Sequence, residues 1–235
     1  MIEMIDTTWL IRTPKGPKAL LNRQSAWFDS RERVGILAAA GTGKSSLARL
    51  LAGIEPPDSG SVRSSGRVSW PIAYAGTLHP ELTGAQNIKI IAQLIGEDPV
   101  EMLAFCEEFT GANLPIARKL KFFAPAQRLA LSFSASMAVQ CDHYIADEVV
   151  GYGDGTTRAK CTAILEERLE KAGLIYISRN AAQLKKLCTR FLVLTQGHLI
   201  ECPSSEIAAA VLENATGTDR DDKLLDQEEI GDVYV

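Results

Sequence analysis

A glycine-rich turn followed by a lysine and a serine is the stretch of this sequence that most clearly carries chemistry. The turn at 38–43 follows the apolar residues 34–37 and leads into Lys44 and Ser45. Such a turn can aim backbone N–H groups at phosphate oxygens, a lysine can reach the terminal phosphates, and a hydroxyl can bind Mg²⁺. Residues 44–52 predict a helix whose N-terminus favours an anion. We therefore predict a phosphate-binding loop (P-loop) formed by Ala38, Ala40, Gly41, Thr42, Gly43, Lys44, Ser45 and Ser46.

One position departs from the full P-loop signature, which begins with a glycine where this sequence has Ala38. A methyl group there would crowd the turn, although the strand before it and the helix after it are in the expected places. The alternative is an ordinary strand-to-helix turn that happens to contain Gly-Lys-Ser.

A pair of carboxylates, Asp147 and Glu148, is the second chemical feature. The pair follows His143-Tyr144-Ile145-Ala146, which predicts a strand. One carboxylate there can bind Mg²⁺ beside a P-loop, and the other can polarise an attacking water. The alternative is an exposed acidic turn after a strand.

The pattern around these residues predicts the elements that position them. Residues 2–29, interrupted by a turn at 13–17, predict a β-hairpin, and residues 84–139 have apolar side chains at helical spacing. Strand and helix patterns alternate elsewhere: strands at 34–37, 61–63, 67–70, 143–146, 174–178, 191–194 and 198–200, helices at 44–52, 156–171 and 181–188. This order predicts an α/β fold: a P-loop core with a parallel sheet, an N-terminal antiparallel β region and a helical insert at about 84–140.

Composition narrows the class of protein. The 235 residues, 46 % of them hydrophobic, suffice for one domain, which we place at 1–214, with a flexible acidic tail at 215–235. The net charge of −4 gives no basic signature for nucleic acid. Five cysteines without a C-x-x-C spacing argue against a disulfide framework and a zinc site. Neither a signal peptide nor a membrane span is predicted, so any membrane role would need a partner.

Further short motifs add a family resemblance that covers about Ile2 to Cys202. The motifs are Pro57-Asp58-Ser59-Gly60, Val68-Ser69-Trp70-Pro71, Leu82-Thr83-Gly84 with Asn87, Ser136-Met137-Ala138, Tyr144-Ile145 before Asp147-Glu148-Val149, Gly153-Asp154 and Lys160-Cys161. Together they resemble the ATP-binding cassette (ABC) ATPase subunits of capsular polysaccharide exporters, and Ser-Trp-Pro above all is typical of that branch.

The resemblance implies a nucleotide-binding domain that dimerises head to tail and closes on ATP and Mg²⁺ between the P-loop of one copy and a signature segment of the other. By position, it implies that Lys44 contacts the β- and γ-phosphates and that Ser45 and Asp147 bind Mg²⁺. Glu148 corresponds to the general base and Asp154 to the D-loop aspartate.

The signature segment departs from the family pattern of Leu/Tyr-Ser-Ser/Gly-Gly-Gln/Met. It aligns with residues 123–127, so the serine is replaced by Ala124 or Pro125 and the glycine by Ala126, while Gln127 keeps the last position. Proline donates no N–H and alanine adds a methyl group, so these changes weaken the surface offered to the partner's nucleotide.

Three further contact positions also differ. The switch histidine of the family falls on Arg179, which can hold a γ-phosphate but cannot shuttle a proton. The Q-loop glutamine falls on His79. The aromatic that stacks on adenine falls near Ile11, with Trp9 two residues away and on the same face of a strand.

The resemblance thus predicts an ATPase subunit of an ABC exporter of capsular or other cell-envelope polysaccharide. It would act at the cytoplasmic face of the cell membrane through an integral membrane permease, as a homodimer or as a heterodimer with another ABC ATPase. The altered contacts favour reduced hydrolysis. One alternative is a degenerate nucleotide-binding regulatory or structural subunit, and another is a soluble P-loop kinase or NTPase without a permease.

Overall fold

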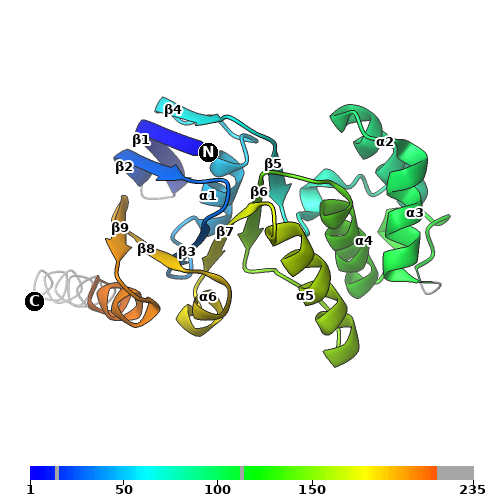
Figure 1. The fold of residues 1–235 in the computed structure, drawn as a ribbon. Helices are drawn as coiled ribbons and strands as arrows, with labels where there is room; N and C mark the ends of the chain where they lie inside the picture. Colours follow the sequence, from blue (N-terminus) through cyan, green and yellow to red (C-terminus); the bar gives the residue numbers. More distant parts are fainter. Residues whose placement is uncertain (14–15, 112–113, 216–235) are drawn as a thin grey trace, which may run out of the picture.

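An antiparallel sheet forms the N-terminal part of the computed structural model, which describes residues 1–13, 16–111 and 114–215 (Figure 1). Strand β1 (Ile2–Thr13) pairs with β2 (Gly16–Phe28) on one side and with β4 (Ser59–Ser64) on the other. The predicted hairpin is confirmed, although residues 14–15 of its turn lie outside the described residues. β4 extends the hairpin into a three-stranded sheet, a pairing that the sequence does not reveal.

The second sheet has six strands among the described residues, in the order β5-β6-β7-β3-β8-β9. All neighbours are parallel except β8 and β9, which form an antiparallel pair. The strands are β3 (Arg33–Ala38), β5 (Val68–Pro71), β6 (His143–Asp147), β7 (Gly173–Ser178), β8 (Arg190–Thr195) and β9 (His198–Cys202). The predicted α/β fold with a parallel sheet is confirmed.

Alternate side chains of the central strands pack on opposite faces of this sheet. On β7, for example, Ile175 and Ile177 contact one hydrophobic core, and Leu174 and Tyr176 contact the other. The first core also contains the antiparallel sheet and α1 (Lys44–Leu51). The second contains α5 (Gly155–Leu169) and α6 (Ala181–Leu187), which lie below the sheet in Figure 1. The sheet is therefore buried on both faces, as its apolar strands require.

A helical layer lies beyond the β5 edge of the sheet, on the right of Figure 1. It contains α2 (Gly84–Ile95), α3 (Pro99–Thr110), α4 (Pro125–Ala138) and the 3₁₀ turn Leu120–Phe122. Thr83 and Gln86 form a capping box at the start of α2, and Asp98 caps α3 before Pro99. These helices share a hydrophobic core of their own and lie within the range predicted to be a helical insert.

Residues 205–215 form a helix that the sequence does not predict. Its N–H at Ile207 donates to Ser204 Oγ (3.3 Å), and Ala208 is buried against the core below the sheet. The segment is short, and its apolar residues are mostly alanines, so its helical period is weak in the sequence. The predicted acidic tail lies almost wholly in 216–235, outside the described residues.

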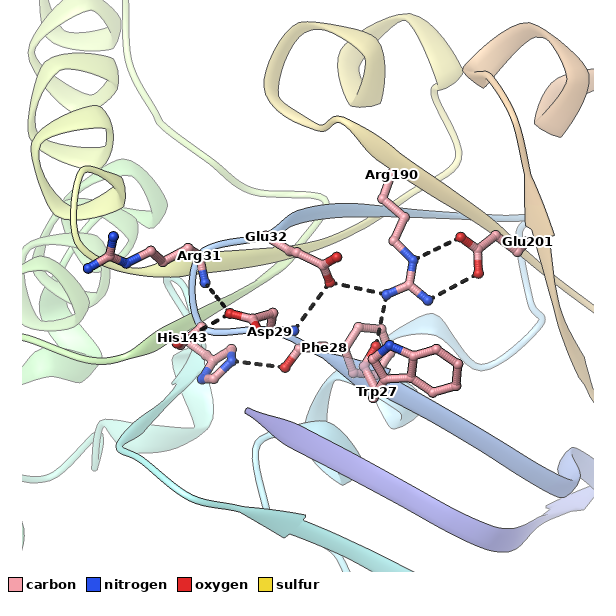
Figure 2. Close-up of polar contacts among 9 residues, drawn as sticks. Trp27, Phe28, Asp29, Arg31, Glu32, His143, Arg190 and Glu201 are labelled. Atoms are coloured by element: carbon pink, nitrogen blue, oxygen red, sulfur yellow. Dashed lines mark hydrogen bonds and ion pairs between the residues drawn. The ribbon is translucent and has the colours of Figure 1, made fainter.

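Arg190, at the start of β8, ties the two sheets together (Figure 2). Its Nη1 donates to the Trp27 carbonyl oxygen (2.8 Å) and to Glu32 Oε2 (3.1 Å). Its Nε and Nη2 donate to the two carboxylate oxygens of Glu201 on β9, each at 3.1 Å. The guanidinium also lies over the Trp27 ring, 5.7 Å from its centroid. The half-buried side chain of Arg190 thus links the end of β2, the connection from β2 to β3 and the edge strand β9.

We expect Arg190→Ala to lower the free energy of unfolding by roughly 2–4 kcal/mol, because it removes the charge-assisted bonds that the guanidinium of a side chain only 15 % exposed makes to two carboxylates and a carbonyl oxygen. The matched control is Lys185→Ala. Lys185 pairs with Glu206, and both side chains are mostly exposed (66 % and 60 %), so that loss should stay below about 1 kcal/mol. Urea denaturation measures both, and equal losses would contradict the role of Arg190.

The same prediction has a pH dependence. The hydrogen bond from Arg190 is the main reason that the pKa of Glu201 lies below its ordinary value of 4.5. A carboxyl group whose pKa is lowered by folding stabilises the fold above its unfolded pKa, and this contribution disappears as the pH falls through the folded value. The difference between wild type and Arg190→Ala should therefore be full at neutral pH and shrink below about pH 4.5.

Candidate functional site

Three neighbouring strands of the parallel sheet end at one place. β6, β7 and β3 are adjacent, and their carboxyl ends carry Asp147, Ser178 and the P-loop, respectively. Ligands of open α/β sheets bind at such an edge. A cavity of about 780 Å³ opens there, lined by Ile11, Gly41, Gly43, Lys44, Ser45, Ser46, Asp147, Glu148, Arg179, Asn180 and Gln183.

The P-loop has the backbone that its glycines make possible. Gly41 and Gly43 have φ values of +75° and +89°, in the left-handed region. A Cβ atom on Gly43 would also lie 2.8 Å from Leu20 Cδ1, so any other residue here would have to displace the end of that side chain as well as adopt an unfavourable backbone conformation. Thr42 Oγ1 donates to the Ala39 carbonyl oxygen (2.8 Å) and braces the turn.

Ala38 is part of the sheet rather than of the turn. It ends β3, pairs with Leu194 of β8 and is fully buried. Its backbone does not have a positive φ, so alanine causes no strain where the full signature has glycine. Ala40 is exposed in the turn itself.

Lys44 and Glu148 form an ion pair in the wall of the cavity. Lys44 Nζ donates to the Ala39 carbonyl oxygen (3.1 Å) and lies 3.5 Å from Glu148 Oε1. The lysine side chain is 12 % exposed and that of Glu148 34 % exposed, so the cation is held within the loop while the carboxylate remains open to solvent. The predicted lysine, the P-loop backbone and the acidic pair therefore surround one space.

The donor set beside the lysine fits Mg²⁺. Ser45 and Asp147 line the same cavity, one from the first turn of α1 and the other from the end of β6. A hydroxyl and a carboxylate are the hard oxygen ligands that this cation takes, usually with phosphate oxygens completing its shell. These two residues would hold the ion, as the sequence predicts.

Arg179 also lines the cavity, but its backbone N–H, rather than its guanidinium, bonds Glu148 Oε1 (3.2 Å). Three further residues belong to the site and are absent from the sequence-based prediction. Ser178, the last residue of β7, bonds Glu148, while Asn180 and Gln183 line the cavity from the N-cap and the first turn of α6. Their only sequence signal is their closeness to the predicted switch residue.

The two residues near the predicted adenine position lie at different depths. Ile11 lines the cavity from β1, whereas Trp9 packs in the core between the sheets and is 8 % exposed. Both residues contact the same core, so the predicted shared face is confirmed. Trp9 lies too deep to offer its ring to a ligand.

Three other predicted residues lie away from this cavity. His79 is exposed in the loop after β5, where its backbone bonds the Asn87 side chain of α2 (2.6 and 3.1 Å). Gln127 lies in the first turn of α4, and its Oε1 accepts the N–H of Ala124 (2.9 Å). Asp154 caps α5, and the bond from the Thr157 N–H (3.1 Å) is the main reason that its pKa is lowered.

The start of α4 shows what the altered signature does locally. Ala124 is the N-cap residue and has no side-chain acceptor, and Pro125 occupies the first turn. Proline fits that position well because its missing N–H would have no helical partner, but it also removes a donor that could face an anion. Within a single chain this helix start does not line the P-loop cavity.

No helix of the described part of the chain combines the length and apolarity needed to cross a membrane. Within the same residues, no group of three or more His, Cys, Asp or Glu side chains is placed to hold a metal ion.

Comparison with known proteins finds relatives that match most of the chain. The chain is 32 % identical over 200 residues to the capsule polysaccharide export ATP-binding protein CtrD of Neisseria meningitidis, covering 85 % of this chain and 92 % of CtrD. It is 32 % identical over 197 residues to the ATP-binding protein BexA of Haemophilus influenzae, covering 84 % and 91 %. It is also 32 % identical over 202 residues to the polysialic acid transport ATP-binding protein KpsT of Escherichia coli, covering 85 % and 90 %. No protein-family model matches the chain.

Solved structures share the fold at low identity. A dimeric, post-hydrolysis structure of the ATP-binding cassette MJ0796 bound to ADP and Pi superposes with a TM-score of 0.70 and 15 % identity, covering 85 % of this chain and 96 % of that one. A second dimeric structure of the same cassette gives a TM-score of 0.69 and 17 % identity, with the same coverage.

Proposed function

The chain belongs to the ATP-binding cassette ATPases of the polysaccharide-export type, and from this premise we propose that it is the ATP-hydrolysing subunit of an exporter of capsular or another cell-envelope polysaccharide. The observation that carries the proposal is the meeting of Lys44, Asp147 and Glu148 around one cavity at the P-loop. The substrate class comes from the names of two relatives, a capsule polysaccharide export ATP-binding protein and a polysialic acid transport ATP-binding protein.

Each residue of the site has its own role in the hydrolysis of ATP. Lys44 and the backbone N–H groups of the loop bind the terminal phosphates, and Ser45 and Asp147 would hold Mg²⁺, which neutralises phosphate charge. Glu148 accepts a proton from water as the water oxygen bonds to the γ-phosphorus. The bond from that phosphorus to the bridging oxygen breaks, and ADP leaves with the electron pair.

We assign the remaining predicted residues to contacts that form only in an assembly. Residues 1–214 act as one nucleotide-binding domain with a helical subdomain at about 84–140. Gln127 and Asp154, which lie away from the P-loop of their own chain, would face the nucleotide or the P-loop of a second ABC ATPase, in a homodimer or a heterodimer. His79 would link the site to an integral membrane permease at the cytoplasmic face of the cell membrane, where the closed dimer passes on its conformational change.

The altered contacts support reduced hydrolysis. The signature helix offers neither a serine hydroxyl at Ala124 nor an N–H at Pro125, and Arg179 cannot shuttle a proton. The same observations favour the second candidate, a nucleotide-binding regulatory subunit with little turnover. The intact Lys44, Asp147 and Glu148 favour the first.

A test in cells separates these proposals from a soluble NTPase. In the organism that makes this chain, replacing it with Lys44→Ala should abolish surface polysaccharide while the polymer accumulates inside the cell. The Lys185→Ala chain serves as the control and should leave surface polysaccharide unchanged. Unchanged surface polysaccharide in Lys44→Ala would contradict the export function. A Glu148→Gln chain is tested in the same way. If it still supports export while Lys44→Ala does not, ATP binding without hydrolysis suffices for export, which favours the regulatory subunit.

A further inference from the structure

Glu148 has a strained backbone, and its carboxylate is bonded by residues outside β6. It follows the last residue of β6, and its φ of +61° lies in the left-handed region, which is unfavourable for a residue with a side chain. Its N–H donates to the Ile177 carbonyl oxygen of β7 (2.9 Å), so the strained conformation is held by the neighbouring strand. The contacts of its carboxylate likewise come from other elements.

The end of β7 and the residue after it supply most of those contacts. Ser178 Oγ lies 2.7 Å from Glu148 Oε2, and the Arg179 N–H bonds Glu148 Oε1 at 3.2 Å. Together with Lys44 Nζ, 3.5 Å from Oε1, they engage both carboxylate oxygens. A hydroxyl–carboxylate bond of this length is in the charge-assisted class, which is the strong one.

The direction of the Ser178 hydroxyl is fixed as well. Its oxygen accepts the N–H of Asn180 (3.2 Å), so its one hydrogen is left to point at Glu148. Ser178 is fully buried, so no water competes for this bond from its side. Neighbouring contacts reinforce the arrangement, since the Tyr176 hydroxyl donates to Gln183 Oε1 (2.8 Å) and lies 3.4 Å from the Glu148 carbonyl oxygen.

The contrast with Arg179 singles out the serine. Arg179 reaches Glu148 only through its main chain, a contact that every residue type except proline would make. The side chain that orients the carboxylate from β7 is that of Ser178. The sequence draws attention to Arg179 because the family has a histidine there, and the hydroxyl one residue earlier goes unnoticed.

We propose that Ser178 is the positioning residue of the general base, and that its hydroxyl holds the Glu148 carboxylate in the orientation that accepts the proton of the attacking water. This inference rests on the proposed ATP hydrolysis. Orientation of a reacting group is a large part of catalytic efficiency, so loss of one such contact should lower kcat while leaving the binding of ATP intact.

The test is a double-mutant cycle on the full chain with MgATP. Ser178→Ala should lower kcat roughly tenfold to hundredfold with KM changed less than about twofold, and Ser178→Thr, which keeps a hydroxyl, should recover most of kcat. In a Glu148→Gln background, Ser178→Ala should have no further effect, because the serine acts through that carboxylate. Thermal denaturation of each variant checks folding, and Ser178→Cys replaces the alanine variant if the latter does not fold.

The outcomes separate this inference from the proposed function. An unchanged kcat in Ser178→Ala, or the same fractional loss in both backgrounds, would overturn the role of Ser178 while hydrolysis by Glu148 stands. A rise in KM with kcat unchanged would mean that the serine supports ATP binding only, which also overturns the inference. Absence of turnover in the wild type would overturn the proposed function and this inference together.

Discussion

Replacing Glu148 by glutamine is expected to lower ATP hydrolysis at least about a hundredfold and to leave the chain as an ATP-bound dimer. Glutamine has nearly the same shape, and its amide oxygen can still accept the hydrogen bond from Ser178, so the fold of the site should persist. The amide cannot accept a proton from water. It also removes the negative charge that faces Lys44 at 3.5 Å, which favours the binding of phosphates.

Light scattering after size exclusion, with MgATP in the buffer, measures the dimer, and phosphate release measures the rate. The matched control is Glu166→Gln on α5, where the carboxylate pairs with Arg33 at 2.8 Å and does not line the nucleotide cavity. That variant should behave like the wild type. A monomeric Glu148→Gln in MgATP would contradict the predicted dimer, and undiminished phosphate release would contradict the role of Glu148.

Replacing Lys44 by alanine should weaken the binding of ATP roughly tenfold to hundredfold and abolish turnover. Charge-assisted hydrogen bonds to phosphate are worth about 1.5–3 kcal/mol, and no other lysine lines the P-loop cavity among the described residues. The lysine is already held within the loop by the Ala39 carbonyl oxygen, so little side-chain freedom is lost when it binds a ligand.

Equilibrium titration with a fluorescent ATP analogue measures this loss. Lys89→Ala, which removes an exposed lysine of α2, is the control and should bind like the wild type. Unweakened binding in Lys44→Ala would mean that the nucleotide does not occupy the P-loop, whatever its effect on turnover.

The parts of the site that contact phosphate and magnesium could be predicted from the sequence because they depend on local chemistry. Gly41, Gly43 and Lys44 define a turn through their own conformations and charges, and the acidic pair follows the strand pattern of residues 143–146. The parallel sheet follows from the alternation of strands and helices. Strand pairing then brings both motifs to one edge, as the structure confirms.

Contacts between distant segments could not be predicted in this way. Ser178 is an ordinary strand-end serine until β7 pairs with β6 and its hydroxyl meets Glu148, 30 residues away in the chain. Arg190 likewise becomes a link between sheets only when Trp27 and Glu201 lie beside it. The burial of Trp9 depends on how the antiparallel sheet packs on α1, which a local sequence pattern does not predict.

The most direct test of the account is the initial rate of phosphate release from MgATP by the purified wild-type chain, alongside Lys44→Ala and Glu148→Gln. We predict a slow, Mg²⁺-dependent rate that Lys44→Ala abolishes and Glu148→Gln lowers at least about a hundredfold, as an ATP-driven export subunit with an altered signature segment requires. ATP binding that depends on Lys44, without any phosphate release in the wild type, would contradict hydrolysis by this chain. It would identify the chain as a nucleotide-binding regulatory subunit instead.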